Sequence, residues 1–257
     1  MKELTDIRVT ACIVTYNNGE QVIDTIKSIL QNTQGVSLQL YVSDNGSADN
    51  TVEMVRKHFP EVCVVENHHN GGFGWGHNQV ISQIDSDYHA IINPDIHLTE
   101  DSLSKLTAFL EQNPDIVMCC PKIMNEDSTE QYLPKKYPKI RYLLGGRLER
   151  FGGIFKKWRD EYTLRNQSLP DIADIEFCTG CFMFARTALL KEVGGFDDRY
   201  FMYFEDADLT RTLLKKGRVV RTTVTSVVHM WERASAKSFK FLKIQVHSMF
   251  QYFKKWK

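Results

Sequence analysis

The sequence predicts an α/β fold, with a mostly parallel central sheet flanked by helices, and three observations support this fold class. Short apolar runs alternate with segments of helical periodicity up to about residue 120. Most of these runs stop at turns rich in Asn, Asp, Gly or Pro. The chain has 257 residues, 42% hydrophobic and 25% charged, as expected for a soluble globular protein. Strands that alternate with helices in this way usually form a parallel sheet covered by helices.

The elements of the N-terminal half follow from apolar periodicity. Apolar runs predict strands at residues 10–16, 38–42, 62–65, 90–92 and 116–120. Helical spacing predicts helices at about residues 22–32, 49–58, 78–84 and 100–111. Thr99 is the expected N-cap of the last helix, with Glu100 and Asp101 in its first turn.

Periodicity fades from residue 125 to 174, where prolines, glycines, basic and aromatic residues predict a long irregular excursion. Beyond it, the pattern predicts strands at 175–185 and 219–228, helices at 188–193 and 205–216, and a helical tail from about 235. We therefore expect one domain over residues 1–234, with halves at about 1–124 and 125–234, followed by a basic, aromatic tail at 235–257.

Charge and cysteine content narrow the functional classes. The 32 basic and 32 acidic residues balance, so nothing indicates a nucleic-acid partner. No apolar run approaches the roughly 20 residues that span a bilayer, and the first six residues lack a signal-peptide core. Six cysteines in a chain of this length suggest reduced thiols, so we expect a cytoplasmic protein.

Two acids follow predicted strands directly. Asn93-Pro94-Asp95 ends one strand, because proline lacks an N–H and fixes φ, and Asp44 ends another. The carboxyl ends of parallel strands share one sheet edge, where such folds bind ligands. Asp44 is placed to bind a ribose or base, and Asp95 to bind a metal or sugar. The alternative is that both acids only form local Asx-turns.

Glu205 and Asp206 open a predicted helix after a run of aromatic residues. The helix dipole alone could explain two acids there, but an acid among aromatic rings also suits a general base, because desolvation raises its pKa. Asp208 is expected to be a solvated or capping acid. His229 ends the last strand and becomes a candidate metal ligand only if it lies near Asp95.

One cysteine pattern and one glycine pattern are only weak indications of a metal, redox or dinucleotide site. Cys178 and Cys181 fit C-x-x-C, but without a second pair or a helix start they are expected to be buried thiols. Gly72, Gly74 and Gly76 have the spacing G-x-G-x-G after the third strand, which is not the dinucleotide fingerprint.

Several motifs occur in an order that resembles inverting family 2 glycosyltransferases of the GT-A fold, especially bacterial rhamnosyltransferases that build O-antigen and related polysaccharides. The motifs lie at residues 15–17, 43–47, 70–78, 93–95, 179–182, 194–197 and 201–208. The resemblance covers about residues 8–250, and the motifs are specific as a set although each alone is weak.

The resemblance implies a role for each matching position. The base and ribose pocket would be lined by Thr15, Tyr16, Asn17 and Asp44. The donor site would be shaped by Gly72, Phe73 and Asn78. The donor diphosphate and a Mn²⁺ or Mg²⁺ ion would be contacted by Asn93, Asp95 and His229. The catalytic base would come from Glu205 and Asp206, with Asp206 preferred.

One departure concerns the metal. The family's D-x-D motif reads Asn93-Pro94-Asp95 here, and a neutral amide is a poorer ligand for a hard cation than a carboxylate. In the absence of a metal, basic residues of the excursion would neutralise the leaving diphosphate: Lys135, Lys136, Arg141 and Arg147.

The resemblance implies a nucleotide-sugar donor, dTDP-β-L-rhamnose, and a saccharide acceptor linked to a lipid such as undecaprenyl diphosphate. Asp206 would deprotonate the acceptor hydroxyl, and a single displacement would invert the anomeric centre. The nearest alternative is a glucosyl-, galactosyl- or N-acetylhexosaminyltransferase that uses a UDP-sugar. A sugar-phosphate nucleotidylyltransferase fits less well, since those enzymes open with a glycine-rich loop. A non-catalytic carbohydrate-binding protein would leave the placement of the acids as coincidence.

Residues 233–257, which include the tail, contain seven Lys or Arg, several aromatic residues and no acid. A basic amphipathic helix can lie on an anionic membrane, which would place the protein peripherally on the inner face of the cell membrane. The alternative is that the aromatic face packs on the domain or on a second subunit, as in a homodimer.

Overall fold

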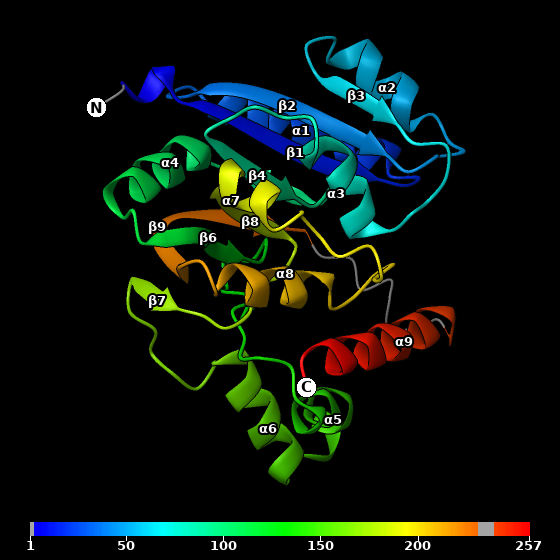
Figure 1. Ribbon diagram of the computed structural model, residues 1–257, viewed down its shortest axis with the longest axis vertical. Helices are drawn as coiled ribbons and strands as arrows, with labels where there is room; N and C mark the ends of the chain where they lie inside the picture. The colour runs from blue at the N-terminus through cyan, green and yellow to red at the C-terminus, as the bar shows by residue number, and fades with distance from the viewer. Residues whose placement is uncertain (1–2, 231–238) are drawn as a thin grey trace.

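A computed structural model describes residues 3–230 and 239–257. Within these ranges, nine strands form a curled, mixed sheet between two layers of helices (Figure 1), which confirms the α/β fold class. The strand order is β3-β2-β1-β4-β8-β6-β9-β5, and β7 pairs with β9 outside this path. Residues 231–238, which include the expected boundary between domain and tail, lie outside the described residues.

The bounds of the elements are as follows. The strands are β1 Arg8–Thr15, β2 Ser37–Asp44, β3 Cys63–Glu66, β4 Tyr88–Ile92, β5 Ile96–Leu98, β6 Ile116–Met124, β7 Ile172–Asp174, β8 Phe182–Arg186 and β9 Arg218–His229. The α-helices are α1 Gly19–Asn32, α2 Thr51–His58, α3 Phe73–Ile81, α4 Ser102–Gln112, α5 Ile140–Leu148, α6 Gly153–Thr163, α7 Thr187–Glu192, α8 Glu205–Leu213 and α9 Phe239–Lys255. Two short 3₁₀ helices are η1 Leu4–Asp6 and η2 Glu149–Phe151.

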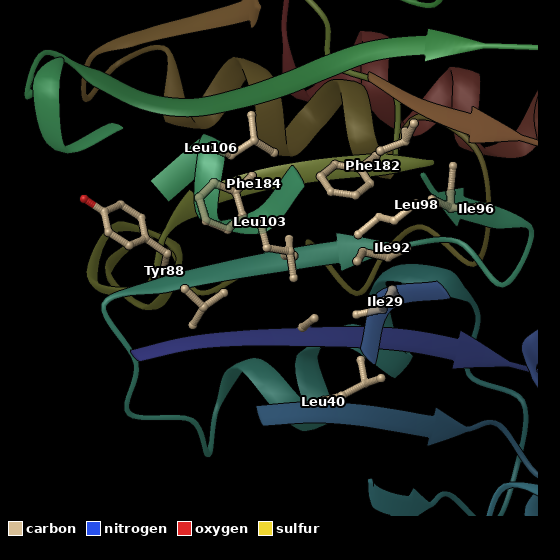
Figure 2. Packing of buried hydrophobic residues seen from close by; sticks show 14 of the residues in the cluster. Ile29, Leu40, Tyr88, Ile92, Ile96, Leu98, Leu103, Leu106, Phe182 and Phe184 are labelled. Carbon is tan, nitrogen blue, oxygen red and sulfur yellow. The ribbon is translucent and has the colours of Figure 1, made fainter. Parts of the chain in front are cut away.

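The N-terminal part of the sheet is parallel. Strand β1 lies between β2 and β4, and β3 extends the sheet beyond β2. Alternate residues of a strand point to opposite faces, so Ile13 packs with α1 and α2 while Val14 packs with α3. Both faces are covered, which is why these strands read as continuous apolar runs. Figure 2 shows the cluster on the face covered by α1 and α4, around Ile92 and Phe184.

The C-terminal part of the sheet is mixed. Strand β8 runs antiparallel to both β4 and β6, and β9 pairs with β6 in parallel but with β5 and β7 antiparallel. Strand β5 was not expected, since three residues after a proline carry almost no periodic signal. Of the run predicted as one strand at 175–185, only the last part is a strand, because β7 ends before it at Asp174 and β8 begins at Phe182.

Helix α3 begins at Phe73, five residues before its predicted start. Glycines normally argue against a helix, but here they permit close packing. A Cβ atom on Gly74 would lie 2.7 Å from Cβ of Phe196, and one on Gly76 would lie 2.8 Å from Cγ1 of Val14. The glycines therefore let the first turns of α3 lie directly against the sheet and the 194–197 turn.

Two other predictions need correction. The excursion at 125–174 is not irregular throughout, because it contains α5, η2 and α6. Helices α5 and α6 approach closely where Gly145 lies against Trp158. The N-cap of α4 is Asp101 and not Thr99. The side chain of Asp101 accepts a hydrogen bond from the backbone N–H of Ser104.

In the described parts of the chain, no helix is long and apolar enough to cross a bilayer.

Helix α9 packs on the domain through its aromatic residues. Tyr252 is fully buried and lies against Phe204, in a cluster that also contains Tyr142 and Tyr162 of α5 and α6. The hydroxyl of Ser248 donates a 2.7 Å hydrogen bond to the carbonyl of Met202. The tail helix therefore supports the loop that leads into α8 (Figure 1).

Candidate active site

The register between β5 and β9 brings two predicted metal ligands together. Ile96 pairs with His229, and the N–H of Met230 donates to the carbonyl of Asp95. As a result, Nε2 of His229 lies 3.2 Å from Oδ2 of Asp95, and both side chains are largely buried. The other oxygen of Asp95, Oδ1, is buried and has no hydrogen-bond partner among the described residues.

Gln131 fixes the orientation of His229. Its Nε2 donates to the backbone carbonyl of His229 at 2.9 Å and to Oδ1 of Asn125 at 2.8 Å, so its Oε1 is the acceptor. Nδ1 of His229 therefore donates to this oxygen at 2.9 Å. In the neutral ring, the lone pair then lies on Nε2, on the side of Asp95, as in histidines that bind metals.

The acid pair sits at the N-terminus of α8, after a strained turn. Tyr203 and Phe204 both have positive φ, 68° and 70°, which is costly for residues with large side chains. This turn sets Glu205 and Asp206 against the loop between β7 and β8. The carboxylate of Asp206 accepts hydrogen bonds from the N–H groups of Gly180 at 3.1 Å and Ala207 at 2.9 Å.

The two acids differ in how their charged forms are stabilised. Burial raises the pKa of Asp206, while the charge of Lys135 and the two N–H donors oppose this rise. Burial raises the pKa of Glu205 well above its usual value, and the charge of Asp206 raises it further. Oε2 of Glu205 is buried without a hydrogen-bond partner among the described residues. Burial and charge therefore favour the neutral form more strongly for Glu205 than for Asp206.

One cavity of about 780 Å³ joins these groups. Its lining includes six predicted site residues: Phe73, Asn93, Asp95, Glu205, Asp206 and His229. The lining also includes four residues from the segment expected to be irregular: Tyr132, Lys135, Arg159 and Thr163. Of the four basic residues expected near the diphosphate, Lys135 lines the cavity, whereas Lys136 and Arg141 pair with Glu161 and Arg147 lies outside the lining.

The predicted nucleoside residues lie at the ends of β1 and β2. The carboxylate of Asp44 is 2% exposed and accepts hydrogen bonds from Thr15, from the N–H of Gly46 and twice from Ser47. Asn17 also joins the two loops, since its N–H donates to Oγ of Ser47. Asp44 thus forms the local turn that the alternative interpretation described, although it also lines a second cavity of about 760 Å³. Thr15, Asn17 and the half-exposed Tyr16 line neither cavity.

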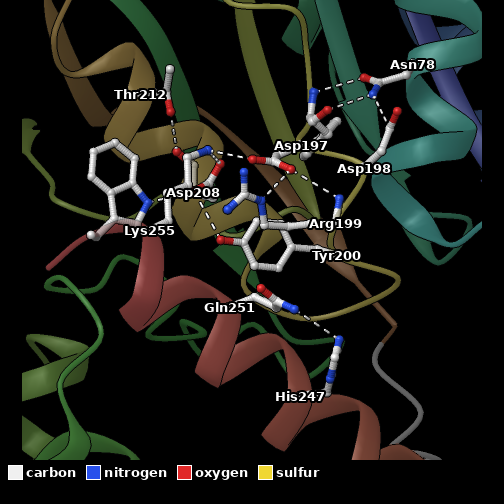
Figure 3. A network of polar contacts seen from close by, with 12 residues as sticks. Asn78, Asp197, Asp198, Arg199, Tyr200, Asp208, Thr212, His247, Gln251 and Lys255 are labelled. Atoms are coloured by element: carbon white, nitrogen blue, oxygen red, sulfur yellow. Dashed lines mark hydrogen bonds and ion pairs between the residues drawn. The ribbon is translucent and has the colours of Figure 1, made fainter.

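Gly72 and Asn78 act on the backbone around the cavity. Gly72 has φ of 96°, and a Cβ atom there would lie 1.9 Å from the carbonyl oxygen of Phe201. The next N–H, of Phe73, donates to that same oxygen at 3.1 Å. The amide of Asn78 exchanges hydrogen bonds with the backbone of Phe196 and is not part of either lining (Figure 3).

Asp208 is not the solvated or capping acid that the sequence suggested. It is 2% exposed and accepts hydrogen bonds from Nζ of Lys255 at 2.7 Å, Nε1 of Trp256 at 2.6 Å and the hydroxyl of Tyr200 at 3.3 Å. Lys255 also pairs with Asp197 at 2.8 Å. This network, seen in Figure 3, ties the tail helix to α8, one turn from the acid pair.

Replacing Lys255 by methionine should lower the free energy of unfolding by about 2 kcal/mol, because a buried carboxylate loses a charged hydrogen-bond donor. Chemical denaturation would measure the change. The matched control is Lys254→Met, at an exposed neighbouring position, which should change stability by less than about 0.5 kcal/mol. Equal effects of the two substitutions would show that the contact to Asp208 contributes nothing specific.

The structure adds cavity residues that the sequence did not indicate, above all Gln131, Arg159 and Thr163. They come from a segment without periodicity, and their positions depend on how α6 and the 125–135 loop pack. Cys178 and Cys181 are buried free thiols, as expected. Among the described residues, no three His, Cys, Asp or Glu side chains form a metal-binding group.

A family model describes the N-terminal three quarters of the chain. The model for "Glycosyl transferase family 2" matches residues 10–194. Among proteins of known function, the N-acetylglucosaminyl-diphospho-decaprenol L-rhamnosyltransferase of Mycobacterium tuberculosis is 26% identical over 228 residues, which cover 83% of this chain and 72% of the relative. Rhamnosyltransferase WbbL of Escherichia coli is 25% identical over 217 residues, with coverage of 80% and 77%.

Solved structures share the fold. The mannosyltransferase PcManGT of Pyrobaculum calidifontis, in complex with GDP-Man and Mn²⁺, superposes with a TM-score of 0.62 at 16% identity and covers 89% of this chain. GalNAc-T7, with UDP, GalNAc and Mn²⁺, gives a TM-score of 0.68 at 13% identity and covers 95% of this chain. The chain spans 58% and 48% of these two proteins, respectively. These similarities establish the GT-A fold.

Proposed function

Because the chain belongs to glycosyl transferase family 2, we propose that it transfers L-rhamnose, with inversion, from dTDP-β-L-rhamnose to a hydroxyl of a lipid-linked saccharide. The choice of sugar rests on two rhamnosyltransferase relatives, each about one quarter identical to this chain. The lipid-linked acceptor rests on the relative that acts on a diphospho-decaprenol substrate. A cytoplasmic protein that works at the membrane surface fits such an acceptor.

The observation that supports the proposal best is the meeting of two charged groups in one cavity. Asp95 and His229 line one part of it, and Glu205 and Asp206 line another. An inverting transfer needs both, since the leaving diphosphate must be neutralised on one side of the anomeric carbon while a base acts on the other.

The protein's own residues have distinct tasks in the reaction. Asp206 carries the negative charge of the acid pair and accepts the proton of the acceptor hydroxyl, so that this oxygen attacks the anomeric carbon opposite the diphosphate. Glu205 stays protonated and can donate a hydrogen bond into the site. Lys135 lines the same cavity, and its positive charge favours the charged form of Asp206. A single displacement from the β-linked donor gives an α-linked rhamnose.

The residues present fit a Mg²⁺ or Mn²⁺ ion. Oδ1 of Asp95 is buried and without a hydrogen-bond partner in the described chain, and His229 presents Nε2 beside it. Two protein ligands are fewer than a self-sufficient metal site needs, but Mg²⁺ is commonly held by one or two carboxylates together with substrate phosphates. Asp95 and His229 would hold the ion, which would supply charge neutralisation for the diphosphate.

The pH dependence of turnover tests the role of Lys135. Its charge lowers the pKa of Asp206 against the effect of burial. Removing that charge in Lys135→Met raises the pKa further, so Asp206 becomes protonated at a higher pH and the acidic limb of kcat shifts upward. The control, Lys136→Met, alters a residue paired with Glu161 and should leave the limb in place. An unchanged limb in Lys135→Met would contradict the coupling.

Thermal shift with a panel of nucleotide sugars tests the donor assignment. We expect dTDP-β-L-rhamnose to raise the Tm more than UDP-glucose, UDP-galactose, UDP-N-acetylglucosamine or GDP-mannose, and Mn²⁺ or Mg²⁺ to enlarge the shift. In Asp95→Asn, the metal-dependent part of the shift should disappear while the rest remains. Stabilisation by UDP-sugars and not by dTDP-rhamnose would overturn the rhamnose assignment and leave the family unchanged.

A further inference from the structure

Four large apolar side chains are exposed within fifteen residues of the α5–η2–α6 segment. The exposed fractions are 63% for Ile140, 44% for Leu144, 64% for Phe151 and 54% for Ile154. Ile140 and Leu144 are one turn apart on α5, while the opposite side of this helix, with Tyr142 and Gly145, is buried. Exposed apolar groups that gather in one segment indicate a contact surface more strongly than scattered ones do.

The same segment carries excess positive charge. Between residues 139 and 165 there are eight Lys or Arg and three acids. Each of the three acids is paired within this segment: Glu149 with Arg165, Asp160 with Lys156 and Glu161 with Arg141. Four bases next to the apolar side chains form no ion pair with a described residue: Lys139, Arg147, Arg150 and Lys157. Two of them lie over aromatic rings, Lys139 over Tyr142 and Arg150 over Phe151. Apolar side chains among unpaired bases match a surface that is apolar inside and anionic outside, as an acidic bilayer leaflet is.

The position of this segment also fits a substrate held in a membrane. Helices α5 and α6 lie together at the end of the molecule away from β2, β3 and α2 (Figure 1). Arg159 and Thr163 of α6 line the cavity that contains Asp206. Helix α6 therefore contributes one exposed apolar side chain, Ile154, near its start and part of the cavity wall near its end. An acceptor that extends from a bilayer at this surface would have a short path to the base.

We propose that residues 139–157, here called the α5–α6 surface, bind the anionic leaflet of a membrane. Four apolar side chains enter the headgroup region: Ile140, Leu144, Phe151 and Ile154. The four bases without an ion pair contact lipid phosphates. This assigns membrane contact to a segment other than the basic tail, whose residues Tyr252 and Trp256 are engaged with the domain. The inference extends the proposed function, since it explains how a lipid-linked acceptor is reached, but vesicle binding can be measured without any transfer.

Sedimentation with vesicles tests the α5–α6 surface. The whole protein should bind vesicles of phosphatidylglycerol and phosphatidylcholine at low salt, bind less at high salt, and bind pure phosphatidylcholine poorly. The double variant Leu144→Glu/Phe151→Glu should bind the anionic vesicles at least about tenfold more weakly. The matched control is Ile172→Glu/Val224→Glu, which changes two side chains that are each 41% exposed elsewhere on the sheet and should bind as the wild type does.

Three outcomes would overturn the inference. The first is a wild type that fails to bind anionic vesicles at low salt. The second is that the tail variant Lys240→Glu/Lys254→Glu loses vesicle binding while the double variant Leu144→Glu/Phe151→Glu keeps it. The third is that the double variant changes its oligomeric state although no vesicle binding is observed. The surface would then be an interface between copies of the chain. Transfer to a water-soluble acceptor should be unchanged in the same variants. A negative result with vesicles therefore leaves the proposed function to be tested separately by the transfer measurement.

Discussion

Replacing Asp206 by asparagine is expected to lower kcat for sugar transfer by about a thousandfold, the size of a general-base contribution. Asparagine keeps the shape of the side chain but has one oxygen, so it keeps one of the two hydrogen bonds that Gly180 and Ala207 donate to Oδ2 and Oδ1 of Asp206. The affinity for the donor should persist, while the acceptor hydroxyl loses the group that takes its proton. Steady-state turnover, together with donor binding by calorimetry, measures both quantities.

The matched control is Glu205→Gln. Burial and the charge of Asp206 raise the pKa of Glu205 well above its usual value, so a neutral amide resembles Glu205 more closely than Asp206. We expect this variant to lose much less activity, about tenfold. If Asp206→Asn retains turnover and Glu205→Gln does not, the base is Glu205 and the assignment of protons within the pair is wrong.

Replacing Gly72 by alanine is expected to lower the free energy of unfolding by about 3 kcal/mol, because strain and overpacking add. The left-handed φ of 96° disfavours alanine, and the new Cβ would lie 1.9 Å from the carbonyl oxygen of Phe201. That oxygen belongs to the loop that ends in Asp206, so the loop must shift. Transfer should fall with stability, and denaturant unfolding and turnover would measure the two effects.

The variant Gly194→Ala measures the cost of a left-handed φ without a steric clash of the new Cβ atom. Gly194 also has a left-handed φ, 81°, but nothing lies within 4 Å of the position where its Cβ would be. We expect this control to lose about 1 kcal/mol and to keep its activity. Equal losses in the two variants would mean that the contact between Gly72 and Phe201 does not position the acid loop.

The parallel part of the fold was predictable because its strands are buried on both faces. Residues 10–16 and 90–92 read as continuous apolar runs, and the structure places β1 and β4 side by side in the centre of the sheet. The start of α3 was not predictable from propensity, since Gly74 and Gly76 argue against a helix until their contacts with Phe196 and Val14 are known.

The candidate site was predictable at strand ends and unpredictable elsewhere. Asp95 and His229 were expected to matter if they met, and the three-residue strand β5, which has too little pattern to detect, brings them together. Lys135 reaches the cavity from a segment without periodicity. The burial of Asp208 depends on Lys255 and Trp256, which lie far away along the chain. Each of these features arises from tertiary packing rather than from local sequence.

The most direct test of inverting rhamnosyl transfer is the anomeric configuration of the product. The protein would be incubated with dTDP-β-L-rhamnose, Mg²⁺ and an N-acetylglucosaminyl-diphospholipid acceptor, and the new linkage would be read by NMR. We expect release of dTDP that depends on the acceptor, and an α-linked rhamnose. A β-linked product would contradict the single displacement at Asp206, and transfer from UDP- or GDP-sugars alone would contradict the donor.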